Sequence, residues 1–161
     1  MAIYMKLGTA LKGGVTAEGY TTWVECNSLQ FGIGKGITTP VGNAADRDCS
    51  VASVSEVTVT KDMDPSTIAL FKCAVAGSDK AAKLEIHVLK SDGKKIVPFV
   101  QYEFDNALVS GYSVSSGGDR PSESLSFNFT KIQMKYVASD SGATEGSPAV
   151  AGFDLAKGVP S

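Results

Sequence analysis

The sequence predicts a mainly β fold, either an antiparallel β-barrel or a two-sheet, barrel-like subunit, with one α-helix. Three observations lead to this prediction. Apolar and polar residues alternate at residues 84–88 and 100–105, as in strands with one buried face. Only the segment at residues 64–77 carries both the start and the stop signals of a helix. The strands lack repeated βαβ spacing, and a length of 161 residues fits one domain spanning residues 1–161.

Further strands are expected at residues 3–7, 21–32, 51–60 and 108–115. Towards the C-terminus the apolar parity changes. Odd positions are apolar from Leu125 to Phe129, whereas even positions are apolar from Ile132 to Tyr136. We therefore expect one long strand that changes faces through a β-bulge near residues 130–131.

The helix is predicted from its ends. Asp64 can cap free backbone N–H groups, Pro65 suits the first helical position, and Gly77 can end the helix. Apolar residues at 68–76 spread around most of the circumference of this helix. Because one sheet covers only one side, we expect either a loop or a neighbouring subunit to cover the other.

Two long segments show no hydrophobic period. Residues 34–50 are rich in Gly, Thr, Asp and Asn, and we interpret them as an extended contact loop. Residues 138–148 are interpreted as a flexible loop, because Ser, Gly and acidic residues dominate them. Apolar character returns at residues 150–155, which predicts a short closing strand.

Composition excludes several classes of function. The net charge of −2 argues against nucleic acid as a partner, and no apolar run reaches the ~20 residues needed for membrane insertion. Cys26, Cys49 and Cys73 are odd in number and widely spaced, so neither a disulfide framework nor a zinc site is expected, and their roles stay unassigned. The N-terminus lacks the basic region of a signal peptide, which indicates synthesis in the cytoplasm.

Catalytic groups are few. The only histidine, His87, alternates with apolar residues on the more polar face of its strand, where a structural or solvent role is expected. The glycines at residues 32–36 lack the GK[ST] ending of a phosphate loop, and Asp62 and Asp64 do not match an EF-hand. The sequence therefore predicts no enzyme, no cofactor and no metal site.

A charged turn leads into a long amphipathic strand at residues 119–129. Arg120 and Glu123 could pair with each other, as a surface ion pair, or with groups across an interface. The Arg-Pro pair, the glutamate-containing strand and the Asn-Phe pair also carry a family resemblance.

That resemblance extends along nearly the whole chain. The matching positions are Tyr4, Lys6, Leu7, Lys12 and Gly13; Trp23, Val24, Glu25, Leu29, Phe31 and Gly32; Val57, Thr58, Thr60, Lys61 and residues 64–74; Arg120, Pro121, Glu123, Ser124, Leu125, Asn128 and Phe129; Lys131, Ile132 and Tyr136; and Gly152 and Phe153. With these residues the chain resembles the haemolysin-coregulated protein (Hcp) family, the tube protein of bacterial type VI secretion systems.

The resemblance implies a mechanical function. Family members are β-barrel-like subunits with one helix that assemble head to tail into hexameric rings. The rings stack into a hollow tube, similar to phage tail tubes, inside a contractile sheath and below a spike protein of the VgrG type. Small effector proteins are the expected lumen cargo. The subunit would assemble in the cytoplasm and be secreted to the outside or into a target cell through the type VI apparatus.

The resemblance and the strand parity together predict site residues. Trp23, Leu29 and Phe31 should be buried, whereas Ser28 and Gln30 should face the lumen. The residues expected at subunit interfaces are Ile68, Phe71, Val75, Arg120 and Glu123. The 34–50 loop would reach another subunit or the next ring.

One alternative of another class stays open. A monomeric β-barrel could carry a small ligand in its interior, with the helix closing one mouth. A fused hydrolase would need an added domain, for which this chain has no room.

Overall fold

The structure is a computed structural model that describes residues 1–9, 11–42, 45, 47–76, 82–91, 93, 95–137 and 147–161. Its elements are β1 (Ala2–Leu7), β2 (Val24–Cys26), β3 (Ser28–Gln30), β4 (Ile33–Gly34), β5 (Ile37–Thr38), β6 (Asp48–Cys49), β7 (Ser53–Val54), β8 (Val57–Asp62), α1 (Thr67–Ala76), β9 (Ala82–Ser91), β10 (Ile96–Ser115), β11 (Ser122–Asn128), β12 (Lys131–Tyr136), β13 (Ala149–Asp154) and β14 (Val159–Pro160). This confirms a mainly β chain with one helix among the described residues.

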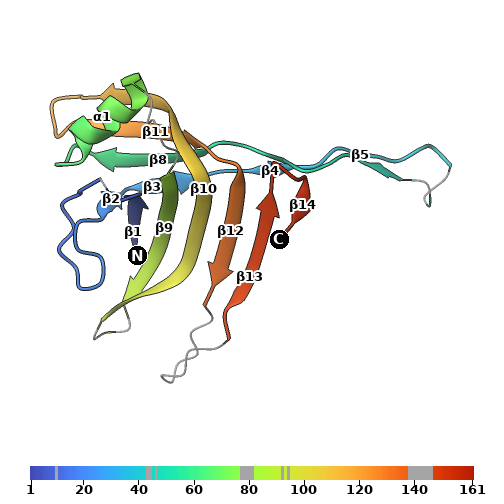
Figure 1. The fold of residues 1–161 in the computed structure, drawn as a ribbon, viewed down its shortest axis with the longest axis horizontal. Helices are drawn as coiled ribbons and strands as arrows, with labels where there is room; N and C mark the ends of the chain where they lie inside the picture. The colour runs from blue at the N-terminus through green and yellow to red at the C-terminus, as the bar shows by residue number, and fades with distance from the viewer. Residues whose placement is uncertain are drawn as a thin grey trace.

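Apart from two short ladders, β4 with β7 and β5 with β6, the strands form two antiparallel sheets that share β10 (Figure 1). Sheet A contains β2, β1, β9, the first half of β10, β12, β13 and β14. Sheet B contains the second half of β10, β11, β8 and β3. The molecule is thus the two-sheet form of the predicted fold and not a closed barrel.

The change of sheet occurs at one corner. Asn106 has a positive φ of 54°, and the register of β10 against β9 shifts between Phe104 and Ala107. Beside it, Thr130 lies between β11 and β12; its backbone N donates to Asp105 O at 3.0 Å and its Oγ1 accepts from Asn106 Nδ2 at 2.9 Å. Both chain segments therefore cross from one sheet to the other at the same place.

This corner corrects one prediction. The expected single strand with a bulge near residues 130–131 is wrong, because β11 pairs with β8 in sheet B whereas β12 pairs with β13 in sheet A. The parity changes because each strand points its apolar side chains into the same core from a different sheet. The predicted strands at 100–105 and 108–115 are, conversely, two halves of β10.

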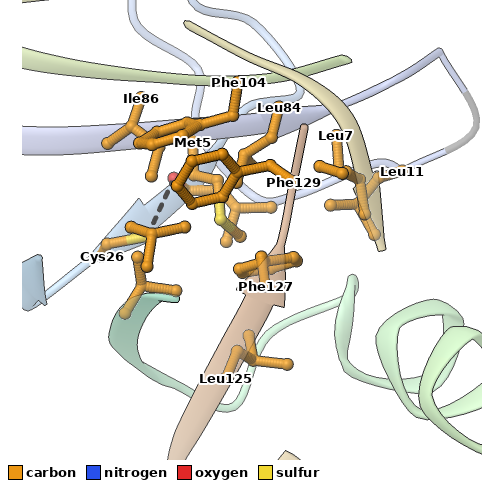
Figure 2. Close-up of a cluster of buried hydrophobic side chains, with 14 of the residues drawn as sticks. Met5, Leu7, Leu11, Cys26, Leu84, Ile86, Phe104, Leu125, Phe127 and Phe129 are labelled. Atoms are coloured by element: carbon orange, nitrogen blue, oxygen red, sulfur yellow. Dashed lines mark hydrogen bonds between the residues drawn. The ribbon is translucent and has the colours of Figure 1, made fainter. Parts of the chain in front are cut away.

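Side chains fill the space between the sheets. Sheet A contributes Met5, Leu84 and Phe104 and sheet B contributes Leu125 and Phe127, and all five are fully or almost fully buried (Figure 2). Such close packing makes this core the main source of stability. The interior of the fold is therefore occupied by the protein itself.

The chain also crosses between sheets at Asn27, which separates β2 from β3. The backbone N of Asn27 donates to Thr60 O at 2.7 Å. Before this crossing, Val24 faces the main core, and its neighbour Trp23 is buried on the opposite side of sheet A. Trp23, Leu29 and Phe31 are all at least partly buried, as predicted, but Trp23 packs in a different cluster from the other two.

A second, smaller cluster lies on the outer face of sheet A, under the segment that joins β1 to β2. It contains Tyr4, Tyr20, Trp23 and Leu89. His87 is buried beside it, and Tyr20 OH lies 3.0 Å from His87 Nδ1. The role of His87 is thus structural; its side chain is not on an open polar face.

His87 should make folding pH-dependent. Burial lowers the pKa of His87 from 6.5 to about 4; Glu103 opposes this shift, and Lys135 and Lys6 add to it. The unfolded chain therefore binds this proton more tightly than the folded chain does. The contribution of the neutral His87 side chain to the free energy of unfolding is complete above pH 6.5 and is lost as the pH falls towards 4. Urea unfolding of wild type and His87→Phe should show that the free energy of unfolding falls between pH 7 and pH 4.5 by an additional amount, on the order of 2 kcal/mol, in wild type only. Parallel pH profiles would contradict a buried neutral imidazole.

The helix packs on sheet B, near β10 and β11 in Figure 1. Asp64 Oδ1 accepts a hydrogen bond from Ser66 N at 2.9 Å, as expected of a cap, and the helix begins at Thr67. Leu70 is its fully buried residue. The predicted end at Gly77 lies outside the described residues. No helix in the described part of the chain is long and apolar enough to cross a membrane.

The described residues between 33 and 54 form an arm that projects away from both sheets (Figure 1). Two short antiparallel ladders, β4 with β7 and β5 with β6, stiffen it, although no hydrophobic period in the sequence indicates them. Its exposed apolar residues are Ile33, Ile37, Val41 and Val51. Most of the 138–148 segment lies outside the described residues, and β13 confirms the predicted closing strand.

Candidate functional site

The outer face of sheet B carries hydroxyl groups in register across four strands. One row runs Ser28, Thr60, Ser124 and Ser113, and the next runs Gln30, Thr58, Ser126 and Gly111. We call this surface the hydroxyl face. Neither row contains a charged side chain, so the two rows are polar but uncharged.

Hydrogen bonds within the sheet join its side chains. Ser28 Oγ and Thr60 Oγ1 share one, and the hydroxyls of Ser110 and Ser126 share another at 3.1 Å. At one end Ser110 Oγ donates its proton to the carboxylate of Glu56 at 2.8 Å. Asp62 follows Thr60 on the same strand face at the other end. Carboxylates therefore border the hydroxyl face.

The sequence predicts only part of this surface. Ser28 and Gln30 are exposed, as expected for residues that alternate with Leu29. The serines of β11 and the threonines of β8 are not among the predicted lumen residues, although every second residue there is a small hydroxyl residue. That signal distinguishes this strand face from an ordinary surface strand, in which lysine and glutamate are common.

A second surface is the outer side of α1. Ile68, Phe71 and Val75 are 64%, 50% and 70% exposed, and their spacing of three and four residues places them on one side of the helix. We call these three residues the helix face. The alternative of a covering loop is not supported, because no described loop buries them. The Phe71 ring meets the Tyr112 ring edge-on, with centroids 5.8 Å apart.

Beneath the helix lies a buried charge network. Lys61 and Glu123 are both fully buried and form an ion pair, and Lys61 Nζ also lies 2.9 Å from Asp64 Oδ1. Thr67 Oγ1 donates to Glu123 Oε2 at 2.9 Å, and Tyr112 OH donates to Glu123 Oε1. Burial and the adjacent Glu123 carboxylate raise the pKa of Tyr112 to about 12. Among described residues no buried side-chain N or O atom lacks a partner.

This network corrects the expectation for Glu123. Its carboxylate points into the subunit and is held by Lys61, Thr67 and Tyr112, so it neither pairs with Arg120 nor reaches a neighbour. Arg120 is exposed, and its Nε donates to Met63 O at 2.8 Å. Arg120 also borders an open polar cleft of about 360 Å³ together with Glu25, Asn27 and Asp62.

Groups suited to catalysis or metal binding are dispersed. The described residues contain no cluster of three or more potential metal ligands. Burial raises the pKa of the Cys26 thiol to about 12, which disfavours the reactive thiolate. Cys49 is exposed on the arm and Cys73 is half-buried on α1, and none of the three is in a disulfide.

The chain is a mainly β, two-sheet subunit with one helix in its described part, and potential catalytic groups there are dispersed, which is the class of structural β subunits. A family model described as "Type VI secretion system effector, Hcp" matches residues 4–136. The chain therefore belongs to the Hcp family and is a tube subunit of type VI secretion.

Individual relatives agree with this assignment. Protein hcp1 of Pseudomonas aeruginosa is 31% identical over 111 residues, covering 66% of this chain and 67% of that protein. A solved structure of a type six secretion system protein is 27% identical, with a TM-score of 0.88 and 99% of each chain covered. Hcp1 from Salmonella typhimurium, at 19% identity, shares the fold, with a TM-score of 0.75 over 98% of this chain and 97% of that one.

Proposed function

We propose that six copies of this chain form a closed ring whose channel is lined by the hydroxyl face, and that the rings stack into a tube. The observation that carries this proposal is the contrast between the two surfaces. The two rows of the hydroxyl face are polar and uncharged, whereas the helix face is apolar and open. In a closed ring the hydroxyl face would line the water-filled channel, and the helix face would be buried against the neighbouring subunit.

The hydroxyl face suits the wall of a channel. Small hydroxyl side chains bind water and form only weak contacts with a passing protein, and they offer no charge to hold it. Ser28 and Gln30 are the proposed lumen residues at the β3 edge of this wall. Small effector proteins are the proposed cargo.

The helix face suits a contact between neighbouring subunits. Six copies around an axis make a heterologous ring, in which the helix face of one copy meets a different surface of the next. A stable contact of this kind buries on the order of 1,600 Å². Ile68, Phe71, Val75 and Arg120 are its proposed residues, and Glu123 is excluded because it is buried.

The arm would connect successive rings. Its projection from the sheets and its exposed apolar residues support a contact beyond the subunit itself. A spike protein of the VgrG type and a contractile sheath are the further proposed partners. We expect no catalytic activity, and we expect the subunit to leave the cell through the type VI apparatus after assembly in the cytoplasm.

The alternative of a monomeric ligand carrier has less support. A carrier needs an open interior, whereas Met5, Phe104 and Leu125 are fully buried in the packed core. Size-exclusion chromatography with light scattering separates the two functions. A mass near six times 16.7 kDa is expected in native buffer, and a stable 16.7 kDa species would contradict the ring.

Gln30→Lys should leave the ring intact but change cargo retention. Gln30 is exposed beside Thr58, so six added cations would make a neutral wall attract acidic effectors and repel basic ones. The measure is the fraction of an acidic effector that elutes with the ring at 50 mM and 500 mM NaCl. Retention should increase at low salt and depend on salt only in the variant.

Gln133→Lys is the matched control for this test. Gln133 follows the core residue Ile132 on β12, so its side chain points to the outer face of sheet A. This variant should retain cargo as wild type does. Loss of the ring in Gln30→Lys, or equal effects in both variants, would contradict the lumen assignment.

A further inference from the structure

Lys61 and Glu123 occupy positions where the strand pattern calls for apolar residues. In β8 the inward residues are Val57, Val59 and then Lys61, and in β11 they are Phe127, Leu125 and then Glu123. The two charged residues face each other directly in the register of the strands. Each strand thus ends its apolar row with a fully buried charge.

Stability alone does not account for this pair. Removing two charges from water costs free energy, and apolar residues of similar size often give equal or greater stability. Apolar side chains, however, cannot make directional bonds. The bonds of this pair extend to the turn before the helix at Asp64, to the first helical residue Thr67, and to Tyr112 on β10.

Tyr112 links this network to the helix face. Its OH donates to Glu123 Oε1, and its ring packs edge-on against Phe71, which is half exposed. The hydrogen bond to Glu123 therefore fixes the hydroxyl end of the Tyr112 side chain, and the ring of Tyr112 supports Phe71 at the centre of the helix face. Any tilt of the ring or of the helix start changes how Phe71 is presented to a neighbour.

We propose that Glu123 and Tyr112 are positioning residues of the subunit interface, which hold Phe71 and the start of α1 in the geometry that a neighbouring copy of this chain binds. Lys61 supplies the counter-charge beside the buried Glu123 carboxylate. The inference rests on the proposed ring and on the helix face as one of its contacts. It assigns a role in assembly to a fully buried glutamate and to a partly buried tyrosine that lies beside the helix face.

Tyr112→Phe tests the inference at the level of one oxygen atom. The aromatic ring that packs against Phe71 is retained, but its hydrogen bond to Glu123 is lost. We expect the concentration for half-assembly, measured by light scattering over a dilution series, to rise about fivefold, as for one lost hydrogen bond. Tyr136→Phe makes the same change at an exposed tyrosine on β12 and should assemble as wild type does.

Lys61→Met/Glu123→Leu separates positioning from stability. Thermal unfolding is compared with and without this change in a Val75→Asp background, in which the chain is expected to be monomeric. The double variant should unfold at the same or a higher temperature, yet the same change in the native background should assemble more weakly than wild type. A purely structural role predicts that assembly falls only in proportion to stability, and that result would overturn the inference.

Phe71→Asp distinguishes failure of the inference from failure of the proposed ring contact. If Phe71→Asp stays monomeric while Tyr112→Phe assembles as well as wild type, the positioning role is wrong and the ring contact stands. If Phe71→Asp assembles normally, the helix face is not an interface and both ideas fail. Weaker assembly of Tyr112→Phe beside a normal Tyr136→Phe supports the positioning role.

Discussion

Phe71→Asp is expected to convert six-copy rings into soluble single copies. Phe71 is half exposed at the centre of the helix face, so aspartate costs little in the isolated subunit. In a ring the same carboxylate would be buried against a neighbour without a partner, which costs several kcal/mol per contact. Light scattering should show one species near 16.7 kDa with a β-type circular dichroism spectrum.

A valine pair supplies the control for this result. Val75 on the helix face and Val41 on the arm are both highly exposed in the isolated chain. Val75→Asp should give single copies, whereas Val41→Asp should keep the six-copy mass and affect only the stacking of rings. Insolubility of Phe71→Asp would indicate that the helix face is buried within the subunit, contrary to its observed exposure.

Glu123→Ala is expected to produce the largest loss of stability among single substitutions in the charge network. The change leaves the Lys61 ammonium buried without its carboxylate and removes the acceptor used by Thr67 and Tyr112. Breaking a buried ion pair from one side costs about 3–5 kcal/mol. Urea unfolding in the monomeric Phe71→Asp background measures this loss without a contribution from assembly.

Glu103→Ala is the matched control for this substitution. Glu103 pairs with Lys83 on the surface, and both side chains are substantially exposed. Exposed ion pairs contribute about 0–1 kcal/mol, so Glu103→Ala should change stability little. Equal losses in the two variants would contradict the special role of the buried pair.

Local patterns in the sequence predicted those elements that depend on near neighbours. Alternation at residues 84–88 is sufficient to predict a strand, because one face of that strand is buried in the core. The cap at Asp64 and the proline after it similarly predict the helix start to within two residues. The exposure of Ser28 follows from the parity of one strand.

Long-range pairing explains what could not be predicted. A reversal of apolar parity around Thr130 has the same appearance whether a strand bulges or whether the chain passes from one sheet to another. Likewise, Glu123 reads as a surface residue until its register partner is known to be Lys61. The hydroxyl face could not be predicted as a whole, because it forms only when β3, β8, β11 and β10 pair side by side.

Electron cryomicroscopy of purified protein, at a resolution that traces side chains, tests the proposed ring. We expect six-fold rings in which Ser28, Thr60 and Ser124 face an open channel and Phe71 is covered by the adjacent copy. Rings that direct this sheet face outwards, or a homogeneous population of single particles with Phe71 still exposed at micromolar concentration, would contradict it.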